Sequence, residues 1–445
     1  MNATRFNKLS LAIGLSIATT SALASPQAFM SSRSFAMAGT GVAVSAPSAA
    51  PSTNPAMMAS QQHDWADDFG VMLPSFNIRA ADEEETVDQI DGIQAVIEDF
   101  NKKASSFDKN SDAEDVRSLQ NTTKELNRRL TAFNNDTVRA NIGLGVALAA
   151  PSPKFSIGAF TSGNVTATAR GEWDDSGDDS DSSLLTRISN ADSAADIDDI
   201  LDQSKKVERD NAGNTSIKLD SRGRILASAV IEAGVSFAST FELNNETSFQ
   251  AGISPKYVQL RTYQYTETVS GFEDDEFDGD DYQTEKSGFN LDVGAAYAFG
   301  EQQEWNAGVV VKNLIPMELD SAQSRPALED KYTLELNPMV TAAIAHKGAY
   351  HVVTAELDLT KKEAFGYEDD TQWLAVGAEF DAWRYAQLRA GVRHNLASNS
   401  DNDGIEETTQ FTAGFGLNVL GARLDLGALY SSADVGAAIE FGASF

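Results

Sequence analysis

Carboxylates and arginines recur at alternate positions of several apolar stretches, where acid–base chemistry could be built. The carboxylates are Asp292, Glu356, Asp358, Glu379, Asp425 and Glu440, and the arginines are Arg389, Arg393 and Arg423. Two neighbouring carboxyl groups can serve as a general acid and a general base. Carboxylates beside guanidinium groups also form ion pairs that need no substrate. We expect this second arrangement and predict no catalytic residue.

The four histidines do not have the spacing of a zinc site. They are His63, His346, His351 and His394. The sequence also contains no nucleophile elbow, no phosphate-binding loop and no Ser-x-x-Lys motif. We therefore predict that the protein is not an enzyme and has no cofactor.

One acidic segment is similar to a calcium-binding loop. Asp274, Glu276, Asp278, Gly279 and Glu285 stand at the first, third, fifth, sixth and twelfth positions of the EF-hand pattern. The glutamate at the third position and the strand-like flanks count against this assignment. We favour a solvated acidic loop and keep Asp274, Glu276, Asp278 and Glu285 as the alternative.

Composition narrows the protein class. The 445 residues include 66 acidic and 34 basic side chains, which give a net charge of -32, and no cysteine. The lack of cysteine excludes disulfides and thiolate metal sites. The strong negative charge disfavours nucleic acid as a partner, because phosphates would be repelled.

The N-terminus has the pattern of a secretory signal peptide. Arg5 and Lys8 flank the start of an apolar run over residues 9–18, and residues 22–24 form an Ala-Leu-Ala cleavage site. This apolar run is too short to cross a bilayer core of about 30 Å. We predict a signal peptide over residues 1–24. No later run is long enough for a membrane helix, so any crossing must use strands.

The rest of the chain alternates between apolar and polar residues in about fourteen stretches. These stretches are 67–80, 137–150, 154–171, 224–243, 248–269, 288–299, 304–313, 331–345, 350–360, 371–381, 387–394, 408–418, 422–430 and 435–445. In one of them, Leu388 and Val392 fall on one face and Arg389 and Arg393 on the other. An even number of such strands is typical of a bacterial outer-membrane barrel. A soluble β-sandwich shows the same alternation and remains open.

Two further patterns favour the barrel. Connections are alternately long and polar, as in 81–136 and 172–223, and short, as in 151–153 and 244–247. Aromatic residues recur near strand ends, where interfacial girdles would lie. They are Phe69, Trp305, Tyr332, Trp373, Trp383, Tyr385 and Tyr430.

The chain divides into three parts. After the signal peptide, residues 25–64 are rich in Ala, Ser, Gly, Pro and Met and have no regular period, which indicates a compact segment buried against another element. Residues 65–445 form the predicted barrel, with long loops 81–136 and 172–223. Helix-spaced apolar residues in 87–100 and 116–133 predict a helical pair on the first loop, and a weaker pattern in 184–201 predicts a short helix on the second.

A family resemblance rests on the segment before the barrel. Ser34-Phe35-Ala36-Met37-Ala38-Gly39-Thr40-Gly41-Val42-Ala43, followed by Asn54-Pro55-Ala56, resembles the opening of FadL/TodX-type outer-membrane proteins. Later segments also resemble this family, namely residues 308–314, 355–359 and 388–395. Within this group the chain looks most like barrels described as "conjugal transfer protein TraF", not like the thioredoxin-like TraF, which the absence of cysteine excludes.

The resemblance implies a fourteen-stranded antiparallel barrel plugged by an N-terminal hatch and a passive route for hydrophobic small molecules. It places a hatch or ligand role on Phe35, Met37, Asn54, Pro55, Met57 and Met58. Packing of the plug without a ligand is the other interpretation of these residues. The alternative function is a structural or assembly component of a conjugation or secretion apparatus that binds protein partners through its outer loops.

The same resemblance implies the outer membrane of a Gram-negative bacterium, reached by export. Its partners would be outer-membrane lipid, the barrel assembly machinery, a hydrophobic ligand or conjugation-apparatus proteins. The last stretch, 435–445, must close the barrel against 67–80, because an unpaired edge is unfavourable in lipid. Phe441 and the terminal Phe445 are similar to the C-terminal aromatic assembly signal of outer-membrane proteins.

Overall fold

The computed structural model describes residues 31–60, 70–82, 86–152, 154–173, 183–209, 215–217, 221–244, 247–268, 280–326, 328–381, 385–397 and 405–444. The predicted signal peptide, Phe69, Trp383, Phe445 and most of the calcium-loop candidate lie outside these residues. Among the described residues, no helix has the length and apolar character needed to cross a membrane.

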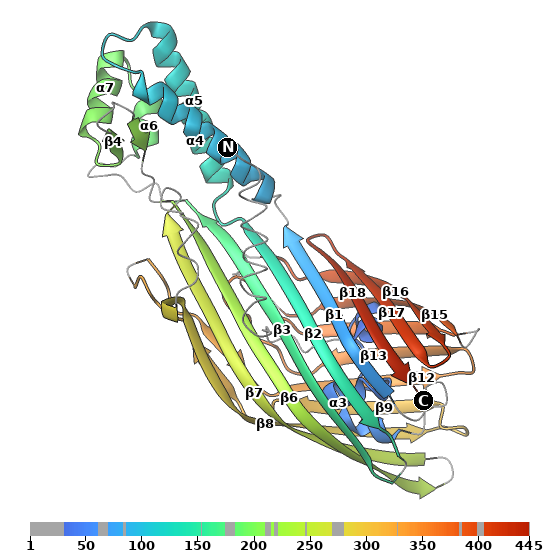
Figure 1. The fold of residues 1–445 in the computed structure, drawn as a ribbon. Coiled ribbons are helices and arrows are strands. Elements are labelled where there is room, and N and C mark those ends of the chain that lie inside the picture. Colours follow the sequence, from blue (N-terminus) through green and yellow to red (C-terminus); the bar gives the residue numbers. More distant parts are fainter. Residues whose placement is uncertain are drawn as a thin grey trace.

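Fourteen antiparallel strands form one closed barrel (Figure 1). They are β1 (Gly70–Asp82), β2 (Thr137–Ala150), β3 (Ser156–Glu172), β6 (Arg222–Asn244), β7 (Thr247–Thr268), β8 (Gln283–Phe299), β9 (Trp305–Lys312), β12 (Met339–Lys347), β13 (His351–Asp358), β14 (Trp373–Phe380), β15 (Ala386–Asn395), β16 (Thr409–Val419), β17 (Ala422–Tyr430) and β18 (Asp434–Ser444). The predicted fold class, an all-β closed barrel of fourteen antiparallel strands, is confirmed.

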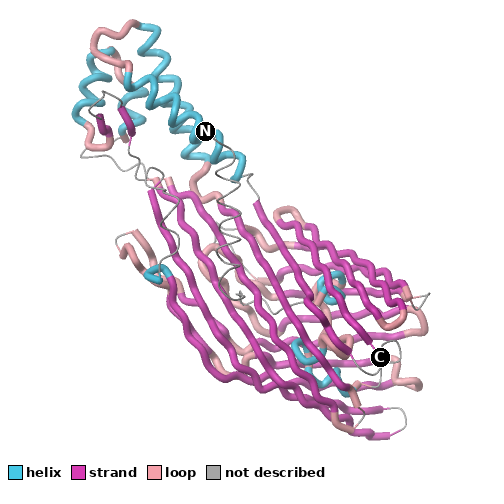
Figure 2. The backbone as a smooth tube through the Cα atoms, viewed as in Figure 1, coloured by secondary structure: helices cyan, strands magenta, loops and turns pink. Residues whose placement is uncertain are grey.

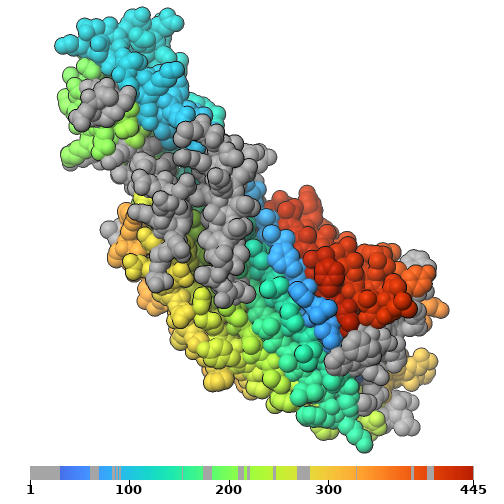
Figure 3. Space-filling view, viewed as in Figure 1, coloured from blue at the N-terminus to red at the C-terminus, as the bar shows by residue number. Residues whose placement is uncertain are grey.

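The barrel closes between its first and last strands. β18 pairs with β17 on one side and with β1 on the other, where Val71 lies opposite Ala443 and Ala80 opposite Val435. These strands are far apart in the sequence and lie side by side, blue against red, in Figure 3. The prediction that the C-terminal stretch is the closing strand is therefore confirmed. Phe441, which is half exposed, faces outward.

Alternation separates a lipid face from a lumen face. Along β15, Leu388 and Val392 are exposed, whereas Arg389 and Arg393 are buried inside the barrel. The lumen arginines Arg389 and Arg423 pair with carboxylates as predicted. The Nε atom of Arg389 lies 2.5 Å from Glu379, and the Nε atom of Arg423 lies 2.5 Å from Asp425.

Replacing Leu426 by arginine is expected to block stable insertion. Leu426 lies in the middle of β17 and is 41% exposed on the outer face, and arginine at the midplane of a bilayer costs about 2–4 kcal/mol. Leu420, at the short turn of the same hairpin, supplies the matched control, because the cost falls to about 0–1 kcal/mol near the interface. The heat-modifiable gel band in outer-membrane fractions measures assembly. Equal loss in Leu426→Arg and Leu420→Arg would contradict this membrane placement.

The long loops gather at one end of the barrel and carry a helical extension. It consists of α4 (Thr86–Ser105), α5 (Ala113–Ala132), α6 (Leu184–Ser189), α7 (Ala194–Gln203) and the small sheet of β4 (Val207–Arg209) and β5 (Thr215–Ile217). Figure 2 shows it, mostly cyan, projecting beyond the strands. Its core joins residues of both loops, including Phe100, Leu126 and Ile188. The helical pair on the first loop is confirmed, and the described part of the second loop carries two helices rather than the single one expected.

One predicted strand is wrong. Residues 331–345 divide into β11 (Thr333–Leu336) and β12, because Pro338 has no N–H to give to a sheet ladder. β11 leaves the barrel and pairs with β10 (Met317–Asp320), so that Met317 lies opposite Leu336. This hairpin of β10 and β11 was absent from the sequence prediction. Elsewhere in the chain, a short 3-10 helix, η3 (Asp280–Tyr282), precedes β8.

Two of the predicted girdle aromatics lie elsewhere. Trp373 faces the lumen, where the guanidinium carbon of Arg393 lies 4.2 Å from its ring centroid. Tyr332 stacks edge-on against Phe365 and Tyr367 near the outer end of the lumen. Both residues lie near the predicted strand ends. The face to which a side chain points depends on the register of the strand, and a shift of one residue moves the side chain to the other face.

Candidate functional site

Residues 31–60 form a hatch inside the barrel. It contains α2 (Ser32–Ala36), α3 (Ala50–Thr53) and the 3-10 helix η1 (Pro55–Ala59). The side chain of Ser31 caps α2 by accepting from Ser34 N, and that of Asn54 caps η1 by accepting from Ala56 N. α2 packs on β15 to β18, whereas α3 and η1 pack on β2, β3, β6, β7 and β8. Side-chain caps and Pro or Gly residues thus divide this segment into short helices that fit inside the lumen.

All six predicted hatch residues are buried. Phe35 packs with Leu429 and Ala438 of the wall, and Met37 packs with Ala345 and Val352. The side chains of Met57 and Met58 share a cluster with wall alanines. That cluster includes Ala149, Ala238 and Ala296. The structure therefore brings these residues to the boundary between hatch and wall.

Asn54 and Pro55 fix the chain path within the hatch. The Asn54 Nδ2 atom donates to the carbonyl of Val42 at 2.7 Å, and its Oδ1 atom accepts from Ala56 N. Pro55 opens η1, a position where its missing N–H would be unpaired in any case. These bonds tie the two halves of the hatch together.

Lumen carboxylates anchor the hatch through charge-assisted bonds. Glu356 Oε1 accepts from the N–H groups of Gly41 and Val42, both at 2.6 Å. Glu379 accepts two bonds from the Arg33 guanidinium, at 2.9 and 3.0 Å. Glu440 accepts from the Ser32 N–H at 2.9 Å. The predicted ion pairing of Glu356 and Glu440 with arginines is thus replaced by bonds to the hatch backbone.

Neutral and basic side chains complete the attachment on the opposite wall. The Asn306 Nδ2 atom donates to the Ala43 carbonyl at 2.7 Å, and the Lys312 Nζ atom donates to the Ser52 carbonyl at 2.7 Å. The hydroxyls of Ser236 and Ser254 donate to the Pro51 carbonyl. The hatch is therefore held by polar contacts on several sides.

Glycines in the wall let the hatch backbone approach the strands. At eight positions a Cβ atom would come closer than 3.0 Å to a hatch atom. These positions are Gly70, Gly158, Gly252, Gly294, Gly308, Gly377, Gly391 and Gly414. The close approach, rather than an unusual backbone angle, is what requires glycine here.

The variant Gly308→Val is expected to displace the hatch. A Cβ atom at Gly308 would lie 2.5 Å from the carbonyl oxygen of Val42, which belongs to the backbone and cannot move alone. A cysteine at buried Ser45, in this cysteine-free chain, reports the displacement through faster maleimide labelling. Gly288→Val is the control, because the nearest side-chain atom there is 3.4 Å away. Unchanged labelling in Gly308→Val would contradict the close packing.

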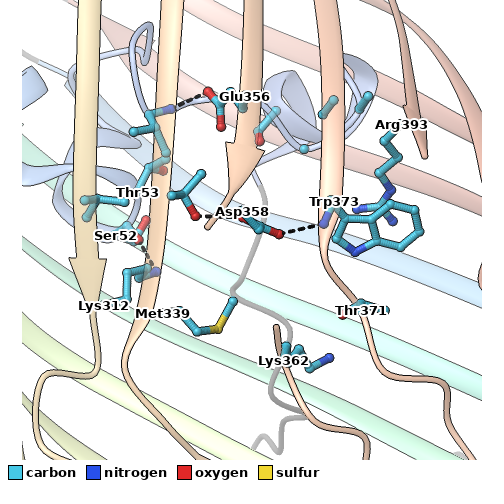
Figure 4. A pocket seen from close by; sticks show the side chains of 17 residues that line it. Ser52, Thr53, Lys312, Met339, Glu356, Asp358, Lys362, Thr371, Trp373 and Arg393 are labelled. Atoms are coloured by element: carbon cyan, nitrogen blue, oxygen red, sulfur yellow. Dashed lines mark hydrogen bonds between the residues drawn. The ribbon is translucent and has the colours of Figure 1, made fainter. Parts of the chain in front are cut away.

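A cavity of about 140 Å³ lies between the hatch and strands β9 and β12 to β15 (Figure 4). Its apolar lining includes Val42, Val310, Met339 and Ala375. Its charged lining consists of Lys312, Glu356, Asp358, Lys362 and Arg393, with the indole of Trp373 beside them. The site thus combines a charged side with an apolar side.

The two carboxylates of the cavity already have partners. Glu356 bonds the hatch, as described above. The Asp358 Oδ1 atom accepts from the Thr341 hydroxyl at 2.7 Å, and its Oδ2 atom accepts from the backbone N–H of Trp373 at 3.1 Å. Figure 4 shows these bonds as dashed lines. The acidic groups are therefore used in holding the cavity together.

Residues 51–358 match the family model described as "F plasmid transfer operon, TraF, protein". The chain belongs to this family. A comparison with curated proteins gives no match.

Three solved structures are similar to this TraF-family chain to different degrees. A TodX deltaS2S3 mutant, described as a monoaromatic hydrocarbon channel, gives a TM-score of 0.50 at 11% identity and covers 94% of this chain and 99% of its own. A Pseudomonas aeruginosa FadL homologue gives 0.46 at 10% identity, covering 96% and 99%. The Pseudomonas putida toluene transporter TodX gives 0.46 at 11% identity, covering 96% and 100%. The first of these matches supports the predicted FadL/TodX-like fold.

An apolar cluster lies nearer the outer end of the lumen of this TraF-family barrel. The wall residues Leu226, Val230, Val258 and Leu260 pack against residues of the outer loops. The loop residues are Met317, Leu334 and Leu336 of the β10–β11 hairpin, with Phe365 and Tyr367. The hairpin therefore folds back over the barrel interior.

The proposed calcium loop is only partly described. Glu285 lies within β8, where it pairs with Arg261 across the strands at 3.2 Å. Asp274, Glu276 and Asp278 lie outside the described residues. Among the residues that are described, no group of three or more His, Asp or Glu side chains could hold a metal ion. The calcium loop therefore stays a prediction, and Glu285 has an ion-pair partner.

Sequence reasoning missed most of the cavity. Lys312, Lys362 and Trp373 come from β9, an outer loop and β14, and no motif connects them. Arg393 was expected to pair with a lumen carboxylate, whereas its Nε atom donates to Gln410 at 2.7 Å. The barrel closure alone brings these side chains to one place.

Proposed function

We propose that this barrel is a passive outer-membrane channel for small hydrophobic molecules, with the hatch as its gate. The observation that carries the proposal is the cavity between the hatch and the wall, because it borders a segment held mainly by individual side-chain bonds. Its volume is close to the roughly 150 Å³ of an engineered cavity that binds benzene. The fold shared with a monoaromatic hydrocarbon channel supports the same reading.

In this proposal the predicted hatch residues line the moving boundary. Phe35, Met37, Met57 and Met58 lie against wall residues, and the flexible thioethers of the methionines adapt to a passing apolar molecule. Asn54 and Pro55 keep the hatch in one piece while it shifts. Their ligand role is part of this proposal.

A reversible lock tests the gate. Cysteines replacing Ala43 and Asn306, which the structure places in contact, would form one disulfide in an otherwise cysteine-free chain. Uptake of radiolabelled toluene by Gram-negative cells that produce this variant is expected to fall on oxidation and to return on reduction. Each single-cysteine variant is the control. Uptake no greater than in cells without the barrel would refute the channel.

The helical extension favours a second candidate function, an assembly component of a conjugation or secretion apparatus. The extension has its own hydrophobic core and stands clear of the strands (Figure 1), so it offers protein partners a surface that transport does not need. Shortening the loops over residues 86–132 and 184–217 separates the candidates. Loss of transfer efficiency with normal toluene uptake supports the assembly role, and the reverse result supports the channel.

We also propose that residues 1–24 direct export and that Phe441 and Phe445 are read by the barrel assembly machinery. Phe441 is outward-facing near the end of β18, where a recognition surface would need it. Deleting Phe445 is expected to reduce the heat-modifiable form several-fold while the unfolded precursor accumulates. Deleting Ser444 and keeping a terminal Phe is the control. Normal assembly without Phe445 would contradict the signal.

A further inference from the structure

The cavity is lined by three basic side chains and two carboxylates. Lys312, Lys362 and Arg393 line it, and the two carboxylates there accept bonds from hatch N–H groups, Thr341 and the Trp373 backbone. No ion pair between a cavity carboxylate and a cavity cation occurs among the described residues. Carboxylates such as Asp358, Glu368 and Glu407 attract Arg393 or Lys362, but within the described part of the chain no ion pair joins them to these cations. An anion in direct contact with these buried cations would therefore be stabilised.

Arg393 presents an unused donor. Its side chain is buried, with 4% of its surface exposed, and its Nε atom donates to Gln410. The guanidinium lies over the Trp373 ring at 4.2 Å, which fixes the plane of the fork. The Nη2 atom has no hydrogen-bond partner. An oriented guanidinium with a free donor suits a carboxylate.

Lys362 supplies the second charge. It is 9% exposed and lies in the outer loop, where it forms a single β-bridge with Thr371. Glu368 and Glu407 attract its ammonium group, and Arg79 and Arg139 repel it. Glu407 is already shared by the two arginines, at 3.0 and 2.6 Å. Burial lowers the pKa of Lys362. A negative charge bound beside the ammonium group would be stabilised and would raise this pKa again.

The apolar side of the cavity limits the rest of the ligand. Val42, Val310, Met339 and Ala375 line it, and its volume of about 140 Å³ is that of a single ring or a short chain. A long acyl chain exceeds this volume. A small inorganic anion would leave the apolar side unfilled.

We propose that this cavity binds a small organic monocarboxylate, with its carboxylate on Arg393 and Lys362 and its ring or short chain against the apolar side. This inference rests on the proposed function and names its substrate class. Lys312 lies on the other side of the cavity in Figure 4, bonded to the hatch through Ser52. A bound carboxylate would attract Lys312 and loosen that bond, which couples binding to the hatch.

The test uses the purified full-length barrel in detergent and two probes of similar shape, benzoate and neutral benzamide. Isothermal titration is expected to give a dissociation constant at least tenfold lower for benzoate. The variant Lys362→Met is expected to raise the benzoate constant at least tenfold and to leave benzamide unchanged. Lys361→Met is the matched control. Lys361 is the next residue in the chain, and its ammonium group is exposed and pairs with Asp370.

The outcomes separate this inference from the proposed function. Equal binding of benzoate and benzamide, equal effects of the two lysine variants, or no binding of either probe would overturn the carboxylate site, while toluene uptake could still support the channel. Benzoate binding that depends on Lys362, together with toluene and benzoate uptake no greater than in cells without the barrel, would leave the site and refute the channel.

Discussion

Replacing Glu407 by alanine is expected to destabilise the barrel by about 3–5 kcal/mol, the usual cost of removing one partner from a buried ion pair. Glu407 Oε1 lies 2.6 Å from Arg139 Nη1 and 3.0 Å from Arg79 Nη2. Both arginines are buried, with 2% of each residue exposed. Asp434 also contacts both arginines. Without Glu407, two buried positive charges would share one remaining carboxylate.

Urea unfolding of the barrel in lipid vesicles, followed by tryptophan fluorescence, measures this loss. Glu406→Ala is the matched control, because Glu406 is the neighbouring residue and is exposed, and it should change the unfolding free energy by less than about 0.5 kcal/mol. Glu407→Gln keeps an oxygen that can accept from arginine and should fall between the two. Equal stability of the two alanine variants would show that the buried arginines do not depend on Glu407.

The strands could be predicted from the sequence because their pattern is local, whereas this network could not, because it joins distant parts of the chain. A strand in lipid must alternate along the chain, so β2 and β17 were placed to the residue by periodicity alone. The network joins Arg79 to Glu407, 328 residues apart. Their meeting depends on closure of the sheet and on the register of β1 against β18, which alternation does not specify.

The hatch was predictable through its motif, but its attachment was not. The residues of 34–43 and 54–56 carry the resemblance, and they do lie in the lumen. Which wall residues hold them depends on the glycine positions and on inward carboxylates such as Glu356, and these have the same sequence pattern whether they bind arginine or a backbone N–H.

Departures from the predicted elements follow local chemistry. Pro338 ends the pairing that continuous alternation over 331–345 suggested, and the freed β11 forms the β10–β11 hairpin. The capping box of Asp112 and Asp115 begins α5, and the backbone N–H groups of Asp115 and Glu114 hold the pKa of Asp112 below its ordinary value. The helices were found by their apolar period, and their ends are set by such caps.

The double variant Arg33→Ala/Glu356→Ala is expected to release the hatch and to raise ion conductance at least tenfold. Glu356→Ala leaves the buried N–H groups of Gly41 and Val42 without their acceptor, at about 1–3 kcal/mol each. Arg33→Ala removes the bidentate bond to Glu379, which keeps its bond to Arg389 at 2.5 Å and so is not left unpaired. Each loss of about 1.4 kcal/mol in the closed state raises the population of the open state tenfold, so an open state that is too rare to detect in the native barrel becomes measurable. Single-channel recording in planar bilayers gives the conductance.

Two controls decide whether the anchors or the charges matter. Arg128→Ala/Glu363→Ala makes the same change in charge at exposed positions outside the lumen and should leave the current unchanged. Glu356→Gln keeps an oxygen acceptor for Gly41 and Val42, so Arg33→Ala/Glu356→Gln should open less than the double alanine variant. A hatch cysteine at Ser45 reports movement independently of current. Faster labelling of that cysteine without a rise in current would mean that the lumen is closed elsewhere, and the apolar cluster of Leu226, Leu334 and Phe365 would then be the barrier to open next.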